Sequence, residues 1–98
     1  MLTITAIIRV KKGCEATMRQ ALLEVAAYVR ANEPKTIGYY VSQDNSDPSM
    51  FTTYERYADQ AAMDQHNGSA AVARFFDIAK PILDGDAILA TSTEISSK

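Results

Sequence analysis

The sequence predicts an α+β domain of the ferredoxin-like type, with the element order β-α-β-β-α-β. Three observations support this: extended segments rich in β-branched and aromatic residues, amphipathic helical segments between them, and the order in which the two kinds alternate. The chain has 98 residues, which is enough for one domain spanning residues 1–98. A domain of this size buries only about 60–65% of its unfolded surface, so its own core is thin.

The first half of the chain contains a strand and a helix. Residues 2–10 alternate with a period of two, so Leu2, Ile4 and Ile8 share a face that Ile7 does not. Residues 15–31 repeat apolar side chains at spacings of three and four, which is typical of an amphipathic helix. The helix ends before Pro34, because proline disfavours helical geometry in the residue that precedes it.

The second half supplies the remaining elements. Two strands, at residues 37–44 and 50–57, flank the turn-forming "DNSDPS" and are expected to pair in an antiparallel hairpin. Asp59 is a candidate N-cap for a short helix that ends at His66, before Asn67-Gly68. Ser69 can cap a further helix, in which Pro81 is expected to kink or end the last turn. A fourth strand is expected at residues 87–95.

In this arrangement the helices cover one face of the sheet and leave the other open. The open face carries Ile7 and, depending on the phase of each strand, apolar residues chosen from Tyr39, Val41, Met50 and Tyr54. An uncovered apolar face indicates a partner, and a second copy of the same sheet would bury it with closed two-fold symmetry. We therefore expect a homodimer.

Composition and charge exclude several classes of function. Ten basic residues against twelve acidic ones give a net charge of -2, without the basic face that nucleic acid requires. No apolar run approaches the roughly 20 residues that span a bilayer, so no membrane association is expected. The N-terminal charges follow the apolar segment, whereas a secretory signal has them first, so we expect a cytoplasmic protein.

Metal and phosphate sites are not supported either. The chain has one histidine, His66, and one cysteine, Cys14, whereas catalytic zinc takes about three protein ligands. Cys14 is either a partly buried residue at a strand–helix turn or, if its thiol is activated, a nucleophile. No glycine-rich loop for a phosphate or dinucleotide is present. We expect no metal and no other cofactor.

Strand parity singles out the third strand. Phe51, Thr53, Glu55 and Tyr57 share one face, an unusual set for a plain core because a carboxylate is rarely buried without a partner. Either this face lines a cavity, or Glu55 lies at the edge of the sheet in water.

The helical residues that follow have two interpretations each. His66 at the end of the short helix is either a proton-transfer group near neutral pH or a residue favoured there by the helix dipole. Phe75 and Phe76 are adjacent on the last helix, so they point in different directions. One belongs to the core, and the other is a candidate for a pocket wall.

Three segments carry a resemblance to a known family: "MLTITAIIRVKKG", "EPKTIGYYVSQDNSDP" and "FTTYERYADQAAMDQHNGS". Their order and spacing resemble the antibiotic biosynthesis monooxygenase family over nearly the whole chain, and the opening segment is most similar to small bacterial quinol-monooxygenase-like proteins. The resemblance implies a dimeric α+β barrel and a cofactor-independent monooxygenase acting on phenols or quinols. The family also includes haem-degrading enzymes and an isomerase of the autoinducer-2 degradation pathway.

The haem-degrading branch is tested by three positions. It resembles this chain in fold but uses an Asn, a Trp and a His where this chain has Ala6, Tyr57 and Phe76. No haem is therefore expected. The commonest family pattern ends the third strand with Trp, but the isomerase branch has a tyrosine there, as this chain does, so the isomerase remains an alternative.

The site that the resemblance implies combines a base, donors and a hydrophobic wall. His66 is the candidate base, Tyr57 and Tyr40 are candidate donors to substrate oxygens, and Glu55 is a candidate to orient His66 or a water. The candidate walls for a small aromatic or hydrophobic substrate are Tyr40, Phe51, Thr53, Phe75 and Phe76. A phosphorylated substrate would need cations, and Arg9, Lys35 and Arg56 are the only nearby candidates. A module that binds a small hydrophobic molecule without turnover is a further alternative.

Overall fold

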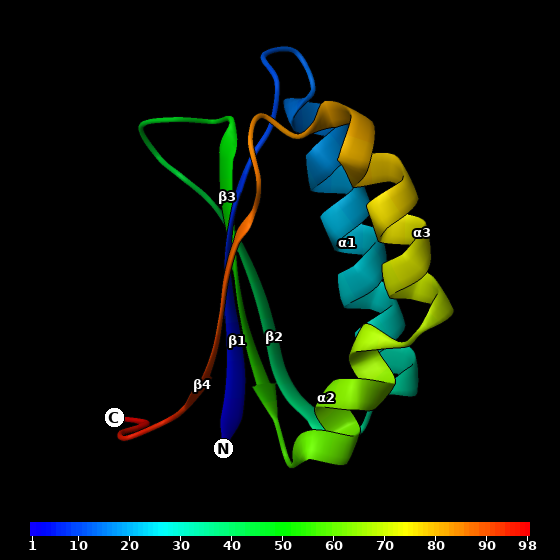
Figure 1. Cartoon of the computed structure of the whole chain (residues 1–98), viewed down its shortest axis with the longest axis vertical. Coiled ribbons are helices and arrows are strands. Elements are labelled where there is room, and N and C mark those ends of the chain that lie inside the picture. The colour runs from blue at the N-terminus through cyan, green and yellow to red at the C-terminus, as the bar shows by residue number, and fades with distance from the viewer.

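The computed structural model describes all 98 residues as a four-stranded antiparallel sheet with helices on one face (Figure 1). The sheet order is β2-β3-β1-β4. The elements follow the predicted order and are β1 (Leu2–Arg9), α1 (Glu15–Asn32), β2 (Thr36–Gln43), β3 (Met50–Tyr57), α2 (Gln60–Asn67), α3 (Ala70–Ala79), a 3-10 turn (Lys80–Ile82) and β4 (Ile88–Thr93). The ferredoxin-like prediction is confirmed. No helix is long and apolar enough to cross a membrane.

The caps that start the two shorter helices are those expected from the sequence. The Asp59 side chain accepts a hydrogen bond from the backbone N–H of Ala62, and Ser69 accepts one from that of Val72. The last helix is shorter than its apolar pattern, because Pro81 lies in a 3-10 turn that follows Ala79. β4 is also shorter than predicted, and all six of its residues are exposed at the edge of the sheet.

A bulge near the start of β2 decides which of its side chains face the helices. Thr36 pairs with Tyr57 but Gly38 pairs with Arg56, so one residue of β2 is extra at this point. Beyond the bulge, Tyr39 faces the helices and Tyr40 faces outward. The Tyr40 ring lies over Gly38, where an added Cβ would come within 2.6 Å of it.

The helix-facing side of the sheet contains two clusters of buried apolar side chains. The larger one joins α1 and α3 to one end of β1 and β3 and contains Ala6, Ile8, Val10, Met18, Leu22, Phe51 and Ala79. The smaller one lies beneath α2 and contains Ile4, Tyr57, Ala62 and Met63. Four of the five buried polar side chains accompany the second cluster, namely Glu33, Thr53, Glu55 and His66.

Candidate active site

The polar cluster is assembled from β3, α2 and the end of α1. The period of two on β3 places Glu55 and Tyr57 on one face of the strand, as predicted, and in the structure this is the buried face that the helices cover. On α2, the spacing of Ala62, Met63 and His66 places all three on the buried face of the helix. Glu33 lies at the C-terminus of α1, and its side chain turns inward.

His66 lies between two carboxylates. Its Nδ1 atom is 2.9 Å from Oε1 of Glu33, which is a hydrogen-bond distance. Its Nε2 atom is 3.6 Å from Oε1 of Glu55, which is an ion-pair distance but too long for a hydrogen bond. The side chains of His66, Glu33 and Glu55 are exposed by only 5%, 3% and 9%, so these ionisable groups are largely removed from water. Such desolvation strengthens the electrostatic interactions among them.

Two hydroxyl groups hold Glu55 in place. The Tyr57 hydroxyl donates to Oε1 at 2.5 Å, and the Thr53 hydroxyl donates to Oε2 at 2.7 Å. A buried carboxylate that accepts two hydrogen bonds is satisfied on both oxygens. Of the two alternatives for Glu55, the structure therefore selects the interior one, since β3 is a central strand and not an edge.

Two tyrosines beside His66 remain protonated at neutral pH. Burial, followed by the hydrogen bond to Glu55, raises the pKa of Tyr57. Burial, followed by the negative charges of Glu55 and Glu33, raises the pKa of Tyr39. The ring centroid of each tyrosine is 5.5 Å from that of His66. Both tyrosines are therefore O–H donors, and neither serves as a base.

The cluster lines one part of a cavity of about 300 Å³ between the sheet and the helices. Thirteen of its eighteen lining residues are hydrophobic. Glu55, His66 and Tyr39 lie in its wall, whereas Glu33 and Tyr57 do not. A mostly apolar cavity with a few converging polar groups is the usual form of a small-molecule site.

The structure brings most of the predicted site residues to this cavity. Thr53, Glu55, His66, Phe75 and Phe76 line it. Phe51 and Tyr57 lie next to it but outside its wall, each at most 1% exposed. The sequence left the phase of β2 open, and the structure shows that Tyr40 is not part of the cavity. It is 56% exposed on the opposite face of the sheet, where its ring stacks on Tyr54.

Sequence reasoning missed Glu33, Tyr39 and Asn67. Glu33 directly precedes Pro34, at the predicted end of the first helix. However, a carboxylate at a helix C-terminus opposes the helix dipole, which is a signal of another role. The face on which Tyr39 lies depends on the bulge in β2. The glycine within that strand is the sequence feature that indicates such a bulge. Asn67 marked only a helix end, and nothing in the sequence pointed to its place in the cavity wall.

No cationic side chain lines the cavity. Arg9 pairs with Asp47 at 3.1 Å, and its side chain is 54% exposed. Arg56 pairs with Glu94 at 2.8 Å and extends from the face of the sheet opposite the helices. Lys35 is exposed in the loop after α1. No group of three or more His, Cys, Asp or Glu side chains could hold a metal ion, and Cys14 is partly buried against the larger cluster.

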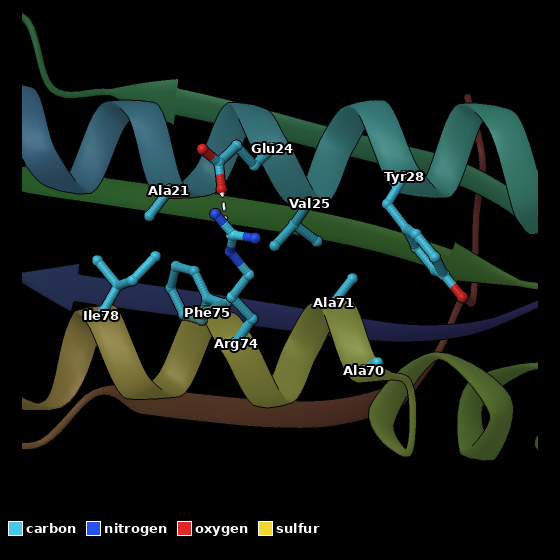
Figure 2. Close-up of a pocket in the computed structure, with 9 residues that line it drawn as sticks. All are labelled: Ala21, Glu24, Val25, Tyr28, Ala70, Ala71, Arg74, Phe75 and Ile78. Carbon is cyan, nitrogen blue, oxygen red and sulfur yellow. Dashed lines mark ion pairs between the residues drawn. The ribbon is translucent and has the colours of Figure 1, made fainter.

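A second hollow, a groove of about 380 Å³, lies between α1 and α3 (Figure 2). Arg74 of α3 reaches across it toward Glu24 of α1, at 3.7 Å, and both side chains are well exposed. Val25 and Phe75 line both this groove and the cavity that contains His66. An exposed pair of this kind contributes little to stability, so the helices are joined here mainly by apolar contacts.

The fold and the site together define a small α+β protein in which one buried histidine lies between two carboxylates beside a mostly apolar cavity. A model of the family described as antibiotic biosynthesis monooxygenase matches residues 1–78. The chain therefore belongs to the antibiotic biosynthesis monooxygenase family. No curated protein matches its sequence.

Solved structures share this fold across the whole chain. An antibiotic biosynthesis monooxygenase is 22% identical, with a TM-score of 0.89, and the match covers 98% of this chain and 100% of that one. PA3566 from Pseudomonas aeruginosa is 23% identical, with a TM-score of 0.87 and coverages of 97% and 94%. Rv0793 from Mycobacterium tuberculosis is 16% identical, with a TM-score of 0.89 and coverages of 98% and 96%. At these identities the likeness shows the fold alone.

Proposed function

We propose that the protein is a cofactor-independent monooxygenase that oxidises a small phenolic or quinol-type substrate with molecular oxygen. The observation that carries this proposal is a single buried imidazole in the wall of an apolar cavity, flanked by carboxylates and neutral tyrosines. A base that removes the substrate's hydroxyl proton, in a site largely closed to water, is what such chemistry requires of a protein.

The reaction begins with proton transfer. His66 takes the proton of the substrate hydroxyl, and the nearby charge of Glu55 stabilises the imidazolium that forms. Tyr39, in the cavity wall, is the donor placed to stabilise the substrate oxyanion. This assignment replaces Tyr40, and it moves Tyr57 from the substrate to the carboxylate behind it.

The oxidation then needs no external reductant. The substrate anion passes one electron to oxygen, and the two radicals combine to form a peroxide anion on the ring. This anion takes back the proton from His66 and becomes a hydroperoxide. Loss of water leaves a quinone, so that a quinol and O₂ give a hydroxyquinone and H₂O. One oxygen atom enters the product and the other leaves as water.

The charges of the site favour a neutral substrate. Two carboxylates flank His66 and no cation lines the cavity, so an anionic substrate would meet uncompensated repulsion. This argues against the alternative of an isomerase acting on a phosphorylated substrate. The alternative of a binding module has the same cavity but requires no proton transfer.

Oxygen uptake with a panel of neutral quinols, and with carboxylated or sulfonated versions of the same rings, tests the proposal. We expect uptake with a neutral quinol, one ¹⁸O atom from ¹⁸O₂ in the product, and no uptake with the anionic versions. Saturable binding without uptake would indicate a binding module. Uptake that yields hydrogen peroxide and no labelled product is autoxidation and would contradict the proposal.

We also propose that the protein works as a homodimer formed through the open face of the sheet. This face exposes apolar side chains, with Tyr40 at 56%, Tyr54 at 38% and Ile88 at 62%. Burying them against a second copy removes a large apolar surface from water. Sedimentation equilibrium is expected to show a dimer, and a monomer at micromolar concentration would contradict this proposal.

A further inference from the structure

Glu33 is a carboxylate in an unfavourable place. It follows the last turn of α1, where the helix dipole disfavours negative charge, and its side chain is only 3% exposed. No donor of the chain reaches its Oε2 atom, which is buried. A buried polar atom without a hydrogen-bond partner lowers the stability of the fold. We therefore expect Glu33 to have a role that offsets this cost.

The contacts of the other oxygen indicate that role. Oε1 of Glu33 is 2.8 Å from the hydroxyl of Thr36, which donates to it, and 2.9 Å from Nδ1 of His66. Since a carboxylate oxygen can only accept, Nδ1 must carry the hydrogen. The other ring nitrogen, Nε2, is then free of hydrogen in the neutral ring, and no hydrogen bond engages it because Glu55 is 3.6 Å away.

We propose that Glu33 is a positioning residue that holds His66 as the Nδ1–H tautomer and so leaves Nε2 free to accept the substrate's proton. Glu33 stands behind the imidazole, outside the cavity wall, whereas His66 and Glu55 lie within the wall. The two carboxylates therefore have different tasks. Glu33 sets the tautomer and orientation of the ring, and Glu55 faces the space in which the substrate would lie.

Of the groups around His66, only Glu33 is placed to set the tautomer of the ring. Tyr39 approaches from β2 and Tyr57 from β3, and both hydroxyls stay neutral at physiological pH. The Tyr57 hydroxyl is already engaged with Glu55. Glu33 and Glu55 are thus the only charges beside the ring, and only Glu33 is at hydrogen-bond distance.

A purely structural role for Glu33 would have different consequences. In that role the carboxylate ties the end of α1 to the start of β2 through Thr36, and the imidazole is simply a neighbour. Replacing Glu33 would then lower the stability of the fold without changing the tautomer of His66. A direct observation of the tautomer separates the two roles.

The histidine of this chain is the only one, so ¹⁵N NMR of the imidazole gives a single unambiguous spin system. In the unaltered full-length protein we expect the neutral form of the ring to carry hydrogen on Nδ1 and none on Nε2. This measurement does not depend on any activity. A neutral ring with hydrogen on Nε2 would overturn the inference.

The variant Glu33→Gln, with Glu24→Gln as its matched control, tests whether Glu33 causes this tautomer. Glu24 also belongs to α1, but its carboxylate is 43% exposed in the groove between the helices. Glu33→Gln keeps the shape of the side chain, but its amide can donate to Nδ1, so we expect hydrogen to move wholly or partly to Nε2. Glu24→Gln should leave the tautomer unchanged. An unchanged tautomer in folded Glu33→Gln would overturn the inference.

Kinetics extend the test, and this part rests on the proposed function. With a quinol that the unaltered protein oxidises, Glu33→Gln should lower kcat roughly 10- to 100-fold. KM should stay nearly unchanged, because Glu33 does not touch the cavity. A raised KM with full kcat would overturn the positioning role. If no quinol is oxidised, the proposed function fails, while the tautomer measurements still decide the inference.

Discussion

The two ends of the helix-facing side of the sheet differ in kind, although the same strands run through both. At one end, β1 and β3 contribute Ile8 and Phe51 to a cluster of apolar side chains only. At the other end, the same strand β3 contributes Tyr57 to the smaller apolar cluster and Glu55 to the polar group that it forms with His66 and Glu33. The apolar end contributes stability by burial, while the polar end carries charges that are costly to bury.

This difference shows that a small domain can bury an apolar cluster and a polar one on the same side of its sheet. The helices contribute unequally, since α1 buries five residues but α3 buries only Ala79. Both Phe75 and Phe76 of α3 line the cavity, but only Phe75 also packs against the larger cluster, as expected for one of the two rings, whereas Phe76 is 44% exposed. Substitutions at the two ends are therefore expected to differ in their effects on stability and on activity.

The largest effect is expected from His66→Ala. If His66 is the base, turnover should fall about 10²- to 10⁴-fold, which corresponds to roughly 3–5 kcal/mol of activation barrier. Steady-state oxygen uptake measures turnover, with circular dichroism to show that the variant folds.

Gln65→Ala is the matched control, because Gln65 is the preceding residue on α2 and is exposed. It should leave turnover unchanged. A folded His66→Ala variant with nearly full activity would remove His66 from the mechanism and leave the tyrosines as the better candidates.

Substitutions at the apolar end should change the stability of the fold. Phe51→Ala removes a ring that is 1% exposed, and we expect a loss of about 3–5 kcal/mol in the free energy of unfolding. Phe76→Ala is the same change at a ring that is 44% exposed, so its cost should be much smaller. Urea denaturation measures both variants. Equal losses would mean that Phe76 is buried in solution, for instance by a partner.

Tyr57→Phe should have an intermediate effect on stability. The change keeps the buried ring but removes the hydroxyl that donates to Glu55 at 2.5 Å. Hydrogen bonds to charged groups contribute about 1.5–3 kcal/mol, and a loss of that size is expected on urea denaturation. Tyr54 makes a bond of the same length to Glu94 on the exposed face, so Tyr54→Phe should cost less. If Tyr57→Phe lost no more stability than Tyr54→Phe, the result would contradict the burial of Glu55.

The smallest effect is expected from alkaline pH. The pKa of Tyr57 is raised above 10.0 in the folded state, so above about pH 10 the folded protein keeps a proton that the unfolded chain loses. The contribution of Tyr57 to the free energy of unfolding is fully present below that pH. It declines as the pH rises, by up to about 1.4 kcal/mol per pH unit. Urea denaturation at a series of alkaline pH values measures this slope. Tyr57→Phe should make it shallower, and an unchanged slope would show that Tyr57 does not cause it.

Much of the fold could be predicted from the sequence because its signals are local. The alternation along β3 predicted its bounds and the face shared by Phe51 and Glu55. Asp59 and Ser69 marked the starts of α2 and α3, because a cap acts on backbone groups two or three residues away. Such interactions are complete within a short stretch of chain, so a sequence pattern is sufficient to locate them.

The candidate site was less predictable, because its contacts join distant segments. The open choice between cavity and edge for Glu55 depended on the position of β3 within the sheet. The partnership of Glu33 and His66 joins residues that are 33 positions apart and depends on how α1 and α2 meet over the sheet. No periodicity within either helix contains that information.

The sequence by itself therefore determined the order of the elements, the caps of α2 and α3, and the two faces of β1 and β3. Only the tertiary structure decided that Tyr39, and not Tyr40, faces the cavity, because one extra residue at the bulge in β2 reverses the faces of every residue after it. It also decided which carboxylate touches His66. Pairing between strands and packing between helices decide such matters, and both involve segments far apart along the chain.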